Sequence, residues 1–270
     1  MTLNLEEFDM GRISFDKTKS QGPVIVLIGR RETGKSFLIR DLLYHHQSIP
    51  VGTVISGTEA GNGFFSEIVP KLFIHHQFKP ELVEKSLERQ KQVIGIYNKK
   101  KNIDPRAFLI LDDCLCDNKW TKEISMRTIF MNGRHWKMML VITMQYPLGM
   151  PPILRTNIDY VFILREPYIS NRKKIYEHFA GMFPRFDTFC QVMDSCTENY
   201  ECLVIDNNSK HNDLNKQVFW YKARERPNYR LGSKQIWEMS KNIPDRDEDL
   251  FDPTNKSKQS ITVKKKKSSW

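Results

Sequence analysis

The sequence lacks long apolar runs, and no stretch approaches the roughly 18 consecutive apolar residues that a membrane-spanning helix needs. Its first residues, 1–9, carry no basic segment followed by an apolar one, so they match neither a secretory signal nor a transit peptide. These two absences predict a soluble protein that is not secreted and has no membrane span.

Paired metal ligands and a disulfide framework are also lacking. The histidine doublets at 45–46 and 75–76 have no accompanying ligand motif, so we expect no structural zinc. The five cysteines form neither a C-x-x-C pair nor an even set, which favours reduced thiols in an intracellular protein. They are Cys114, Cys116, Cys190, Cys196 and Cys202.

Acidic residues are outnumbered by basic ones. The chain has 42 Lys and Arg residues against 32 Asp and Glu residues, which gives a formal net charge of +10. Lys264 to Lys267 supply four of the positive charges, and the rest of the chain is still basic. A basic surface attracts a polyanion, for which nucleic acid is the main candidate, although charge also serves solubility.

The sequence does contain a phosphate-binding loop. Residues 29–36 read G-R-R-E-T-G-K-S, the pattern G-x-x-x-x-G-K-S, directly after the apolar, strand-like run 24–28. Residues 37–44 then repeat their apolar positions as a helix does. A glycine at each end lets the backbone curl until its N–H groups face the phosphate oxygens, and the helix N-terminus adds positive charge beneath the anion.

The loop predicts where a nucleotide and its magnesium ion bind. Lys35 is expected to reach the β and γ phosphates, and the hydroxyl of Ser36 is expected to bind Mg²⁺. The predicted nucleotide-binding residues are Gly29, Arg30, Arg31, Glu32, Thr33, Gly34, Lys35, Ser36 and Phe37.

Two carboxylates predict the second half of this site. Asp112 and Asp113 end the apolar run 107–111, where a magnesium nucleotide site needs acidic groups. Asp112 can hold Mg²⁺ through water, and Asp113 can accept the proton of an attacking water molecule. Such a pair can also begin a turn, but together with the loop at 29–36 it favours nucleotide hydrolysis.

Gln145 and an arginine complete the candidate catalytic residues. Gln145 follows the apolar run 138–143, where its amide could orient water or sense the γ-phosphate, although strand-end glutamines are often surface residues. Arg134, in N-G-R-H, is the first candidate for an arginine finger that reaches a neighbouring subunit, and Arg155 is the second. Arg165 follows the same strand that Arg155 precedes. Salt bridging is the alternative role for all three arginines.

Strand-like runs alternate with helical patterns along the chain, the rhythm of a parallel sheet covered on both faces. We expect a long helix over 80–101, a helix capped by Ser170 and ended by residues 181–184, and a short helix over 186–193. The predicted strands are 24–28, 54–56, 108–111, 139–143 and 160–164, followed by a hairpin of 201–205 and 217–221 joined by 206–216.

The composition divides the chain into three predicted parts. These are an N-terminal extension at 1–20, a P-loop ATPase domain at 21–240 and a disordered basic tail at 241–270, where the sequence turns polar and charged.

The motifs resemble those of the genome-packaging ATPases of nucleocytoplasmic large DNA viruses, a family within the FtsK/HerA superfamily of DNA-pumping motors. The resemblance covers about residues 22–221, and its specificity rests on N-G-R-H, on Gln145 after V-I-T-M, and on the downstream hairpin with N-Y-E-C-L-V-I-D. It implies an α/β fold: a P-loop NTPase three-layer sandwich of RecA/FtsK type, with a mostly parallel central sheet extended by a C-terminal hairpin. In that sheet the strand 138–143 lies between the strand 24–28 and the strand that ends in Asp112.

The resemblance also implies roles for individual residues. Carried over by position, Lys35 and Ser36 bind the nucleotide and Mg²⁺, and Asp112 coordinates Mg²⁺. Asp113 accepts a proton, Gln145 senses the phosphate, and Arg134 is the candidate for the arginine finger. The wider superfamily usually has Glu at the position of Asp113, and a bridging water would restore the reach of the shorter side chain. A homo-oligomeric ring of six subunits is implied, with sites between subunits and an arginine supplied in trans.

The main hypothesis is therefore an ATPase that threads double-stranded viral DNA into a capsid. It would contact DNA phosphates regardless of sequence, and would act with a capsid or portal component in the virion or in the host-cell cytoplasm, at the viral factory. Two alternatives stay open: a P-loop nucleotide kinase, and an ATP-dependent DNA-binding scaffold with residual hydrolysis. The candidate DNA-contacting pore loops are 57–65, 98–103 and 210–216.

Overall fold

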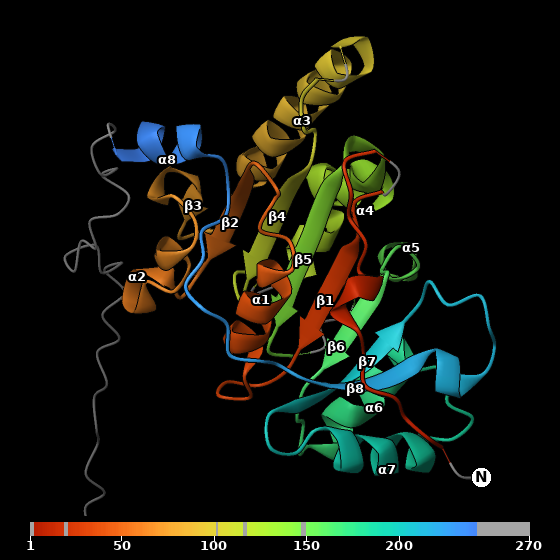
Figure 1. Cartoon of the computed structure of the whole chain (residues 1–270). Helices are drawn as coiled ribbons and strands as arrows, with labels where there is room; N and C mark the ends of the chain where they lie inside the picture. The colour runs from red at the N-terminus through yellow and green to blue at the C-terminus, as the bar shows by residue number, and fades with distance from the viewer. Residues whose placement is uncertain (1–2, 19–20, 101, 116–117, 147–149, 242–270) are drawn as a thin grey trace, which may run out of the picture.

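Short apolar strands form the centre of the molecule (Figure 1). The computed structural model describes residues 3–18, 21–100, 102–115, 118–146 and 150–241. Its strands are β1 (Val24–Ile28), β2 (Gly52–Ser56), β3 (Ile74–His75), β4 (Ala107–Asp112), β5 (Met138–Met144), β6 (Tyr160–Ile163), β7 (Glu201–Asp206) and β8 (Val218–Lys222). The predicted disordered tail, apart from Lys241, lies outside the described residues.

Within the described residues the strands join in one sheet, in the order β3-β2-β4-β5-β1-β6-β7-β8. Neighbours from β3 to β6 pair in parallel, whereas β7 pairs antiparallel with β6 and β8 antiparallel with β7. The mostly parallel sheet with a C-terminal hairpin at its edge confirms the predicted fold. The place of β5, between β1 and β4, also confirms the strand order that the resemblance implied.

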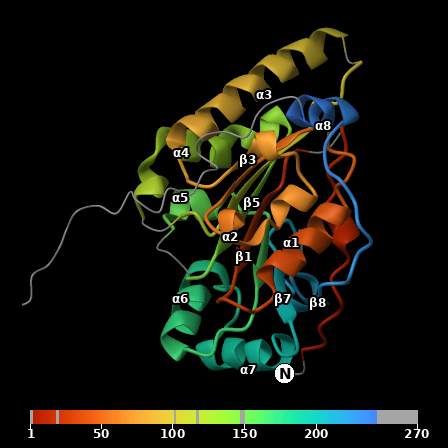
Figure 2. The same cartoon turned by 90° about the vertical axis from the view of Figure 1, so that its left-hand side faces the viewer.

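Helices cover both faces of the sheet (Figure 2). On one face lies α1 (Lys35–Tyr44), and on the other lie α3 (Pro80–Lys100), α4 (Ile124–Asn132), α5 (Pro152–Arg155), α6 (Ile169–Phe179) and α7 (Phe186–Cys196). The shorter elements are α2 (Glu59–Asn62), α8 (Lys234–Lys241), η1 (Met10–Arg12), η2 (Phe65–Glu67), η3 (Lys71–Phe73), η4 (Asn118–Lys122), η5 (Gly133–Trp136) and η6 (Leu214–Lys216). None of the described helices combines the length and the apolar character that crossing a membrane requires.

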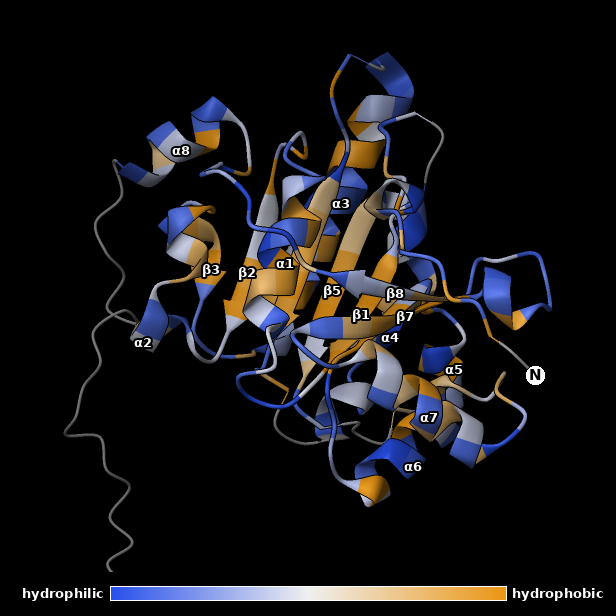
Figure 3. Ribbon diagram, turned by 60° about the horizontal axis from the view of Figure 1, so that its bottom comes forward, coloured by the Kyte–Doolittle hydropathy of each residue, from blue (hydrophilic) through white to orange (hydrophobic). Residues whose placement is uncertain are grey.

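Strand side chains alternate between two apolar clusters. In β1, Val24, Val26 and Ile28 join the cluster beneath α3 to α7, whereas Ile25 and Leu27 join the cluster beneath α1. Because both faces are covered, the strand is an uninterrupted apolar run rather than an alternating one. Figure 3 shows apolar residues concentrated in the central strands and polar residues more frequent in the surrounding helices and loops.

The N-terminal residues pack as part of this core. The N–H of Phe8 donates to the carbonyl of Trp220 (2.8 Å), and the N–H of Trp220 donates to the carbonyl of Glu6 (3.1 Å). The aromatic rings packed edge-on against Phe8, which is 2% exposed, are those of Tyr160, Phe162, Phe219 and Tyr221. The domain boundary near residue 21 stays a prediction, although residues on both sides of it share one core.

The expected cap at Ser170 is wrong. The helix α6 already begins at Ile169, and the residue before it is Tyr168. The carboxylate of Glu166 accepts hydrogen bonds from the N–H of Tyr168 (2.9 Å) and from Nδ2 of Asn171 (3.0 Å). The carboxylate thus lies beside the positive end of the helix, where a negative charge is favourable, but within the described part of the chain it accepts from no backbone N–H of the first turn of α6. The sequence reasoning also missed α4 and β3.

His46 lies in the turn after α1 and makes the fold sensitive to acid. The side chain is 5% exposed, and its Nε2 has no hydrogen-bond partner among the described residues. Burial, followed by the charges of His45 and Arg106, lowers the pKa of His46 from 6.5 to about 4. Because the folded-state pKa is depressed, this stability is present above the unfolded-state pKa and is lost as pH falls toward the folded-state value.

We predict that the titration of His46 lowers the free energy of unfolding by roughly 2 kcal/mol as the pH falls from about 7 to about 5. Urea unfolding of the wild type and of His46→Phe at both pH values checks this. The variant has no titrating group at this position. Its unfolding free energy should therefore lose about 2 kcal/mol less than that of the wild type over the same pH change. Equal losses in the two proteins would contradict the buried, neutral histidine.

Candidate nucleotide site

Residues 29–34 form a tight loop between β1 and α1, and its two glycines lie where a side chain would be strained or would clash. Gly34 has φ +97°, and a Cβ on Gly29 would lie 2.7 Å from Oγ1 of Thr33 and 2.8 Å from Cβ of Leu164. The hydroxyl of Thr33 donates to the carbonyl of Arg30 (2.8 Å) and closes the turn. The pattern therefore folds as a tight strand-to-helix loop, hereafter the P-loop, and its binding of phosphate stays a prediction.

Lys35 lies at the centre of the P-loop. Its side chain is 7% exposed, and Nζ donates to the carbonyls of Gly29 (2.7 Å) and Arg30 (3.1 Å). Nζ also lies 3.5 Å from Oδ2 of Asp113. Burial lowers the pKa of Lys35, while the charges of Asp113 and Asp112 oppose that shift. The loop thus holds a cation at the point where a nucleotide's phosphates would bind.

Three polar side chains form a row across β2, β4 and β5, on the face that α1 covers. Ser56, Asp112 and Thr143 are register partners in neighbouring strands. The hydroxyls of Thr143 and Ser56 donate to Oδ1 (2.8 Å) and Oδ2 (2.9 Å) of Asp112. Burial raises the pKa of Asp112, and these two hydrogen bonds only partly offset it. The row fixes one orientation of the Asp112 carboxylate at the edge of the sheet.

Asp113 turns toward the P-loop because its backbone leaves the strand. Its φ of +44° lies in the left-handed region. Its N–H donates to Oγ1 of Thr143 (3.0 Å), and Nε2 of Gln145 donates to its Oδ2 (3.0 Å). The structure therefore brings Lys35, Asp113 and Gln145 together, as the sequence predicted. Ser56 and Thr143, which orient the two aspartates, were not predicted, although both are short polar residues at strand ends.

The groups present fit a magnesium ion that arrives with a nucleotide. The hydroxyl of Ser36 is exposed in the first turn of α1, and Asp112 provides a carboxylate. Among the described residues no three acidic, histidine or cysteine side chains converge to hold a metal by themselves. Mg²⁺ ordinarily takes one or two protein oxygens together with phosphates and water, which matches this donor set.

Arg134 and Arg155 lie at the opposite edge of the sheet from the P-loop. Arg134 precedes β5, whose seven residues span about 23 Å at roughly 3.3 Å each. Its Nη2 donates to the carbonyl of Asn157 (3.1 Å) and lies 3.7 Å from Oδ1 of Asp159. Arg155 donates from Nη1 to the carbonyl of His178 (3.1 Å), near the end of α6. Neither arginine lies near its own P-loop, so a finger role for either requires a second subunit.

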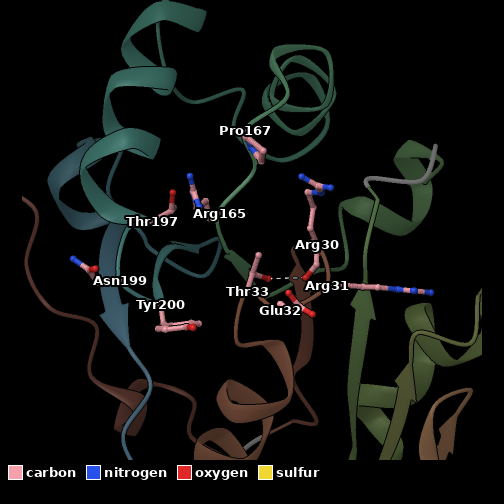
Figure 4. Close-up of a pocket in the computed structure, with 9 residues that line it drawn as sticks. All are labelled: Arg30, Arg31, Glu32, Thr33, Arg165, Pro167, Thr197, Asn199 and Tyr200. Atoms are coloured by element: carbon pink, nitrogen blue, oxygen red, sulfur yellow. Dashed lines mark hydrogen bonds between the residues drawn. The ribbon is translucent and has the colours of Figure 1, made fainter. Parts of the chain in front are cut away.

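Arg165 lies on the other side, beside the P-loop. It follows β6 and lines a cavity together with P-loop residues and with Tyr200, which precedes β7 (Figure 4). Sequence reasoning noted Arg165 only as a flanking residue and missed Tyr200. Tyr200 lies within the motif N-Y-E-C-L-V-I-D, but its place beside the P-loop depends on how the α7–β7 turn folds back onto that loop.

The three candidate pore loops lie at two opposite edges of the sheet, one at the carboxyl edge and two at the amino edge. Residues 57–65 follow β2 at the carboxyl edge of the sheet, with the P-loop. Residues 98–103, of which Lys101 lies outside the described residues, precede β4 at the amino edge. Residues 210–216 join β7 to β8 at that same amino edge, because Asp206 pairs with Tyr160 at the start of β6. The first loop therefore cannot share one rim with the other two.

Comparisons with known proteins agree with this fold. The chain is 40% identical over 242 residues to the uncharacterized protein L437 of Acanthamoeba polyphaga mimivirus, covering 88% of this chain and 83% of the relative. It is 42% identical over 204 residues to the uncharacterized protein 075L of Invertebrate iridescent virus 6, covering 75% and 78%. No family model matches the chain.

A solved structure shows the same architecture. The genome packaging NTPase B204 of Sulfolobus turreted icosahedral virus 2, in complex with AMP, superposes with a TM-score of 0.53 at 20% identity, covering 76% of this chain and 98% of that one. The likeness confirms the expected α/β fold of a P-loop NTPase, with a mostly parallel sheet extended by a C-terminal hairpin.

The buried Asp112 should cost stability at neutral pH. Its folded-state pKa is raised, so the folded protein favours the protonated carboxyl, and that stabilisation is lost as pH rises through the folded-state pKa. We predict that Asp112→Asn raises the midpoint of thermal unfolding at about pH 7, and that the gain disappears in acid. Oδ1 of the new side chain can accept from Thr143, and its amide can donate to Ser56, whose hydroxyl lies 3.3 Å from that of Thr58.

Asp104→Asn is the matched control of opposite sign. Burial raises the pKa of Asp104, but the hydrogen bonds and the charge of Arg106 together lower it by a larger amount. The folded-state pKa of Asp104 is therefore depressed. Its contribution is present at neutral pH and lost in acid. Removing this charge should lower the midpoint at about pH 7. Thermal unfolding of both variants tests these two predictions. A lowered midpoint for Asp112→Asn at about pH 7 would contradict the prediction that the Asp112 carboxylate destabilises the folded protein.

Proposed function

We propose that this chain, which belongs to the family of large-DNA-virus proteins that includes L437 of mimivirus and 075L of Invertebrate iridescent virus 6, is an ATPase that drives double-stranded viral DNA into a capsid. The observation that carries the proposal is the convergence of Lys35, Asp113 and Gln145, with Nζ 3.5 Å and Nε2 3.0 Å from the same carboxylate oxygen. A phosphate-binding cation, a base and a polar amide at one point suit hydrolysis of a nucleoside triphosphate.

Binding of ATP would exchange the partners of Lys35. The ammonium group now donates to two loop carbonyls, and phosphate oxygens would take those hydrogen bonds. Backbone N–H groups of the P-loop and the start of α1 would hold the remaining phosphate charge. Ser36 and, through water, Asp112 would hold Mg²⁺, which neutralises charge on the phosphates when it is bound.

Hydrolysis would proceed between Asp113 and Gln145. Gln145 positions a water molecule, and Asp113 accepts one of its protons as the water oxygen bonds to the γ-phosphorus. The bond between the γ-phosphorus and the bridging oxygen breaks, and ADP leaves with that electron pair. Thr143 orients Asp113 by accepting its N–H, which keeps the base in place during the reaction.

The proposed second substrate is double-stranded DNA, bound through its phosphates without regard to sequence. The formal net charge of +10 supports this choice, and so does the likeness in fold to B204, which is a genome packaging NTPase. The proposed assembly is a ring of six copies that works with a capsid or portal component, in the virion or in the host-cell cytoplasm. In such a ring Arg134, at the edge away from its own P-loop, would serve the site of a neighbour.

We predict that long double-stranded DNA stimulates Mg²⁺-dependent ATP hydrolysis by the wild type. Lys35→Ala and Asp113→Asn should each lower turnover at least about 100-fold, because one loses the phosphate ligand and the other the base. Steady-state phosphate release measures both. Asp187→Asn, which removes an exposed carboxylate paired with Arg185 at 3.2 Å, serves as the control and should leave turnover unchanged.

Three outcomes would contradict the proposal. Turnover that DNA does not change would separate the ATPase from DNA transport. Phosphate that appears only on an added nucleotide would favour a kinase, and tight DNA binding with negligible turnover would favour a scaffold. The affinity for DNA should also fall with salt, at a log–log slope of about −0.9 for each phosphate contacted.

The finger is tested by mixing subunits. If Arg134 acts in trans, Arg134→Ala subunits added to the wild type should lower the activity of the mixture more than their share, since each one disables a neighbour's site. The full loss at saturation should reach about 10³-fold. Arg155→Ala is the matched comparison at the same edge. A decline that only follows dilution for Arg134→Ala would exclude it as the finger.

A further inference from the structure

A cavity of about 620 Å³ lies beside the P-loop, on the side of β6. Three segments line it: the P-loop, the residues after β6 and the α7–β7 turn (Figure 4). Its volume falls within the range of about 300 to 1,000 Å³ that small-molecule sites occupy. Asp113 follows β4 and Gln145 follows β5, on the opposite side of β1, and neither of these two proposed hydrolytic residues lines this cavity.

Tyr200 brings an exposed aromatic ring to the wall of this cavity. The side chain is 70% exposed. Its Cδ1 lies 3.4 Å from the position that a Cβ on Gly34 would take, and Leu164 packs beneath the same glycine at 3.9 Å. The ring of Tyr200 therefore lies next to the P-loop backbone at Gly34. One side of the ring therefore packs against the loop, while most of it remains open.

The backbone holds this ring in an unfavourable conformation. Asn199 and Tyr200 have φ values of +51° and +65°, two consecutive non-glycine residues in the left-handed region. Asparagine adopts this region with little penalty, but a bulky aromatic residue does not. The N–H of Glu201 donates to the carbonyl of Glu198 (2.9 Å) and closes the turn. The exposed ring gains little from burial to offset this cost, and backbone strain of this kind is concentrated at functional sites.

We propose that the ring of Tyr200 stacks on the base of the nucleotide whose phosphates occupy the P-loop. The proposal rests on the proposed function, since it names the part of the same site that holds the nucleoside end of the substrate. The γ-phosphate then points toward Asp113 on one side of β1, and the base lies against Tyr200 on the other. The P-loop backbone between them holds the phosphate chain.

Stacking on Tyr200 also fixes what kind of selectivity to expect. A ring face contacts the π-face that every base has, and does not read the hydrogen-bonding edge. ATP and GTP analogues should therefore depend on Tyr200 to the same degree.

The test measures equilibrium binding of ATPγS and of inorganic tripolyphosphate by titration calorimetry. Tyr200→Asn removes the ring but suits the left-handed backbone, so it preserves the turn. Tyr200→Phe preserves the ring and removes the hydroxyl. Tyr97→Ala, on α3 near the amino edge of the sheet, is the matched tyrosine control away from the cavity.

The expected result is weaker binding of the two nucleotides and unchanged binding of tripolyphosphate. Tyr200→Asn should weaken ATPγS binding about 10-fold, within the range that alanine substitution gives for base–aromatic stacking. Its affinity for tripolyphosphate should stay the same, and GTPγS should lose as much as ATPγS. Tyr200→Phe and Tyr97→Ala should both bind like the wild type.

Two outcomes would overturn the inference while leaving the proposed function in place. Unchanged ATPγS affinity in Tyr200→Asn would show that the ring does not contact the base, and weaker DNA binding in that variant would then assign the ring to DNA. Equal losses for ATPγS and tripolyphosphate would show that Tyr200 only shapes the P-loop. A wild type that binds neither ligand would instead overturn the proposed function itself, and the inference with it.

Discussion

The buried ammonium group of Lys35 is the interaction on which the rest of the site depends. A buried cation is costly unless it is paired and hydrogen-bonded, and here two loop carbonyls and the carboxylate of Asp113 meet that need. The same contacts connect the loop after β1 to the end of β4, across the intervening strand β5. A phosphate group that displaced these partners would find the cation already in place and the surrounding backbone already curved.

The order of the sheet places the remaining groups around that cation. Because β5 lies between β1 and β4, Thr143 contacts both aspartates and Gln145 contacts Asp113, so that each aspartate has a separate environment. Asp112 is buried and oriented by hydroxyl groups, whereas Asp113 turns out of the strand toward Lys35. Two adjacent carboxylates thus become different chemical groups, one suited to a metal and one to a proton. The raised pKa of Asp112 indicates that this arrangement costs folding stability.

Much of this could be read from the sequence, because local patterns determine it. Apolar runs ending in Gly29 and Asp112 predicted the strands, and the sheet order followed from the resemblance. Reasoning failed where distant segments decide the outcome. Ser170 has the chemistry of a cap, but α6 already begins at Ile169, so the serine lies inside the helix. Tyr200 could not be anticipated, since its importance comes from a turn that folds against the P-loop more than 160 residues away in the sequence.

The most direct test of the account is the affinity for ATPγS of the wild type and of Lys35→Met, measured by titration calorimetry. The substitution keeps the apolar stem of the side chain and removes the ammonium group. If phosphate oxygens replace the loop carbonyls as hydrogen-bond acceptors of Lys35, the variant should fold but bind ATPγS about 10- to 100-fold more weakly. That is the loss expected for a charge-assisted hydrogen bond. Equal affinity in the two folded proteins would contradict the account at its centre.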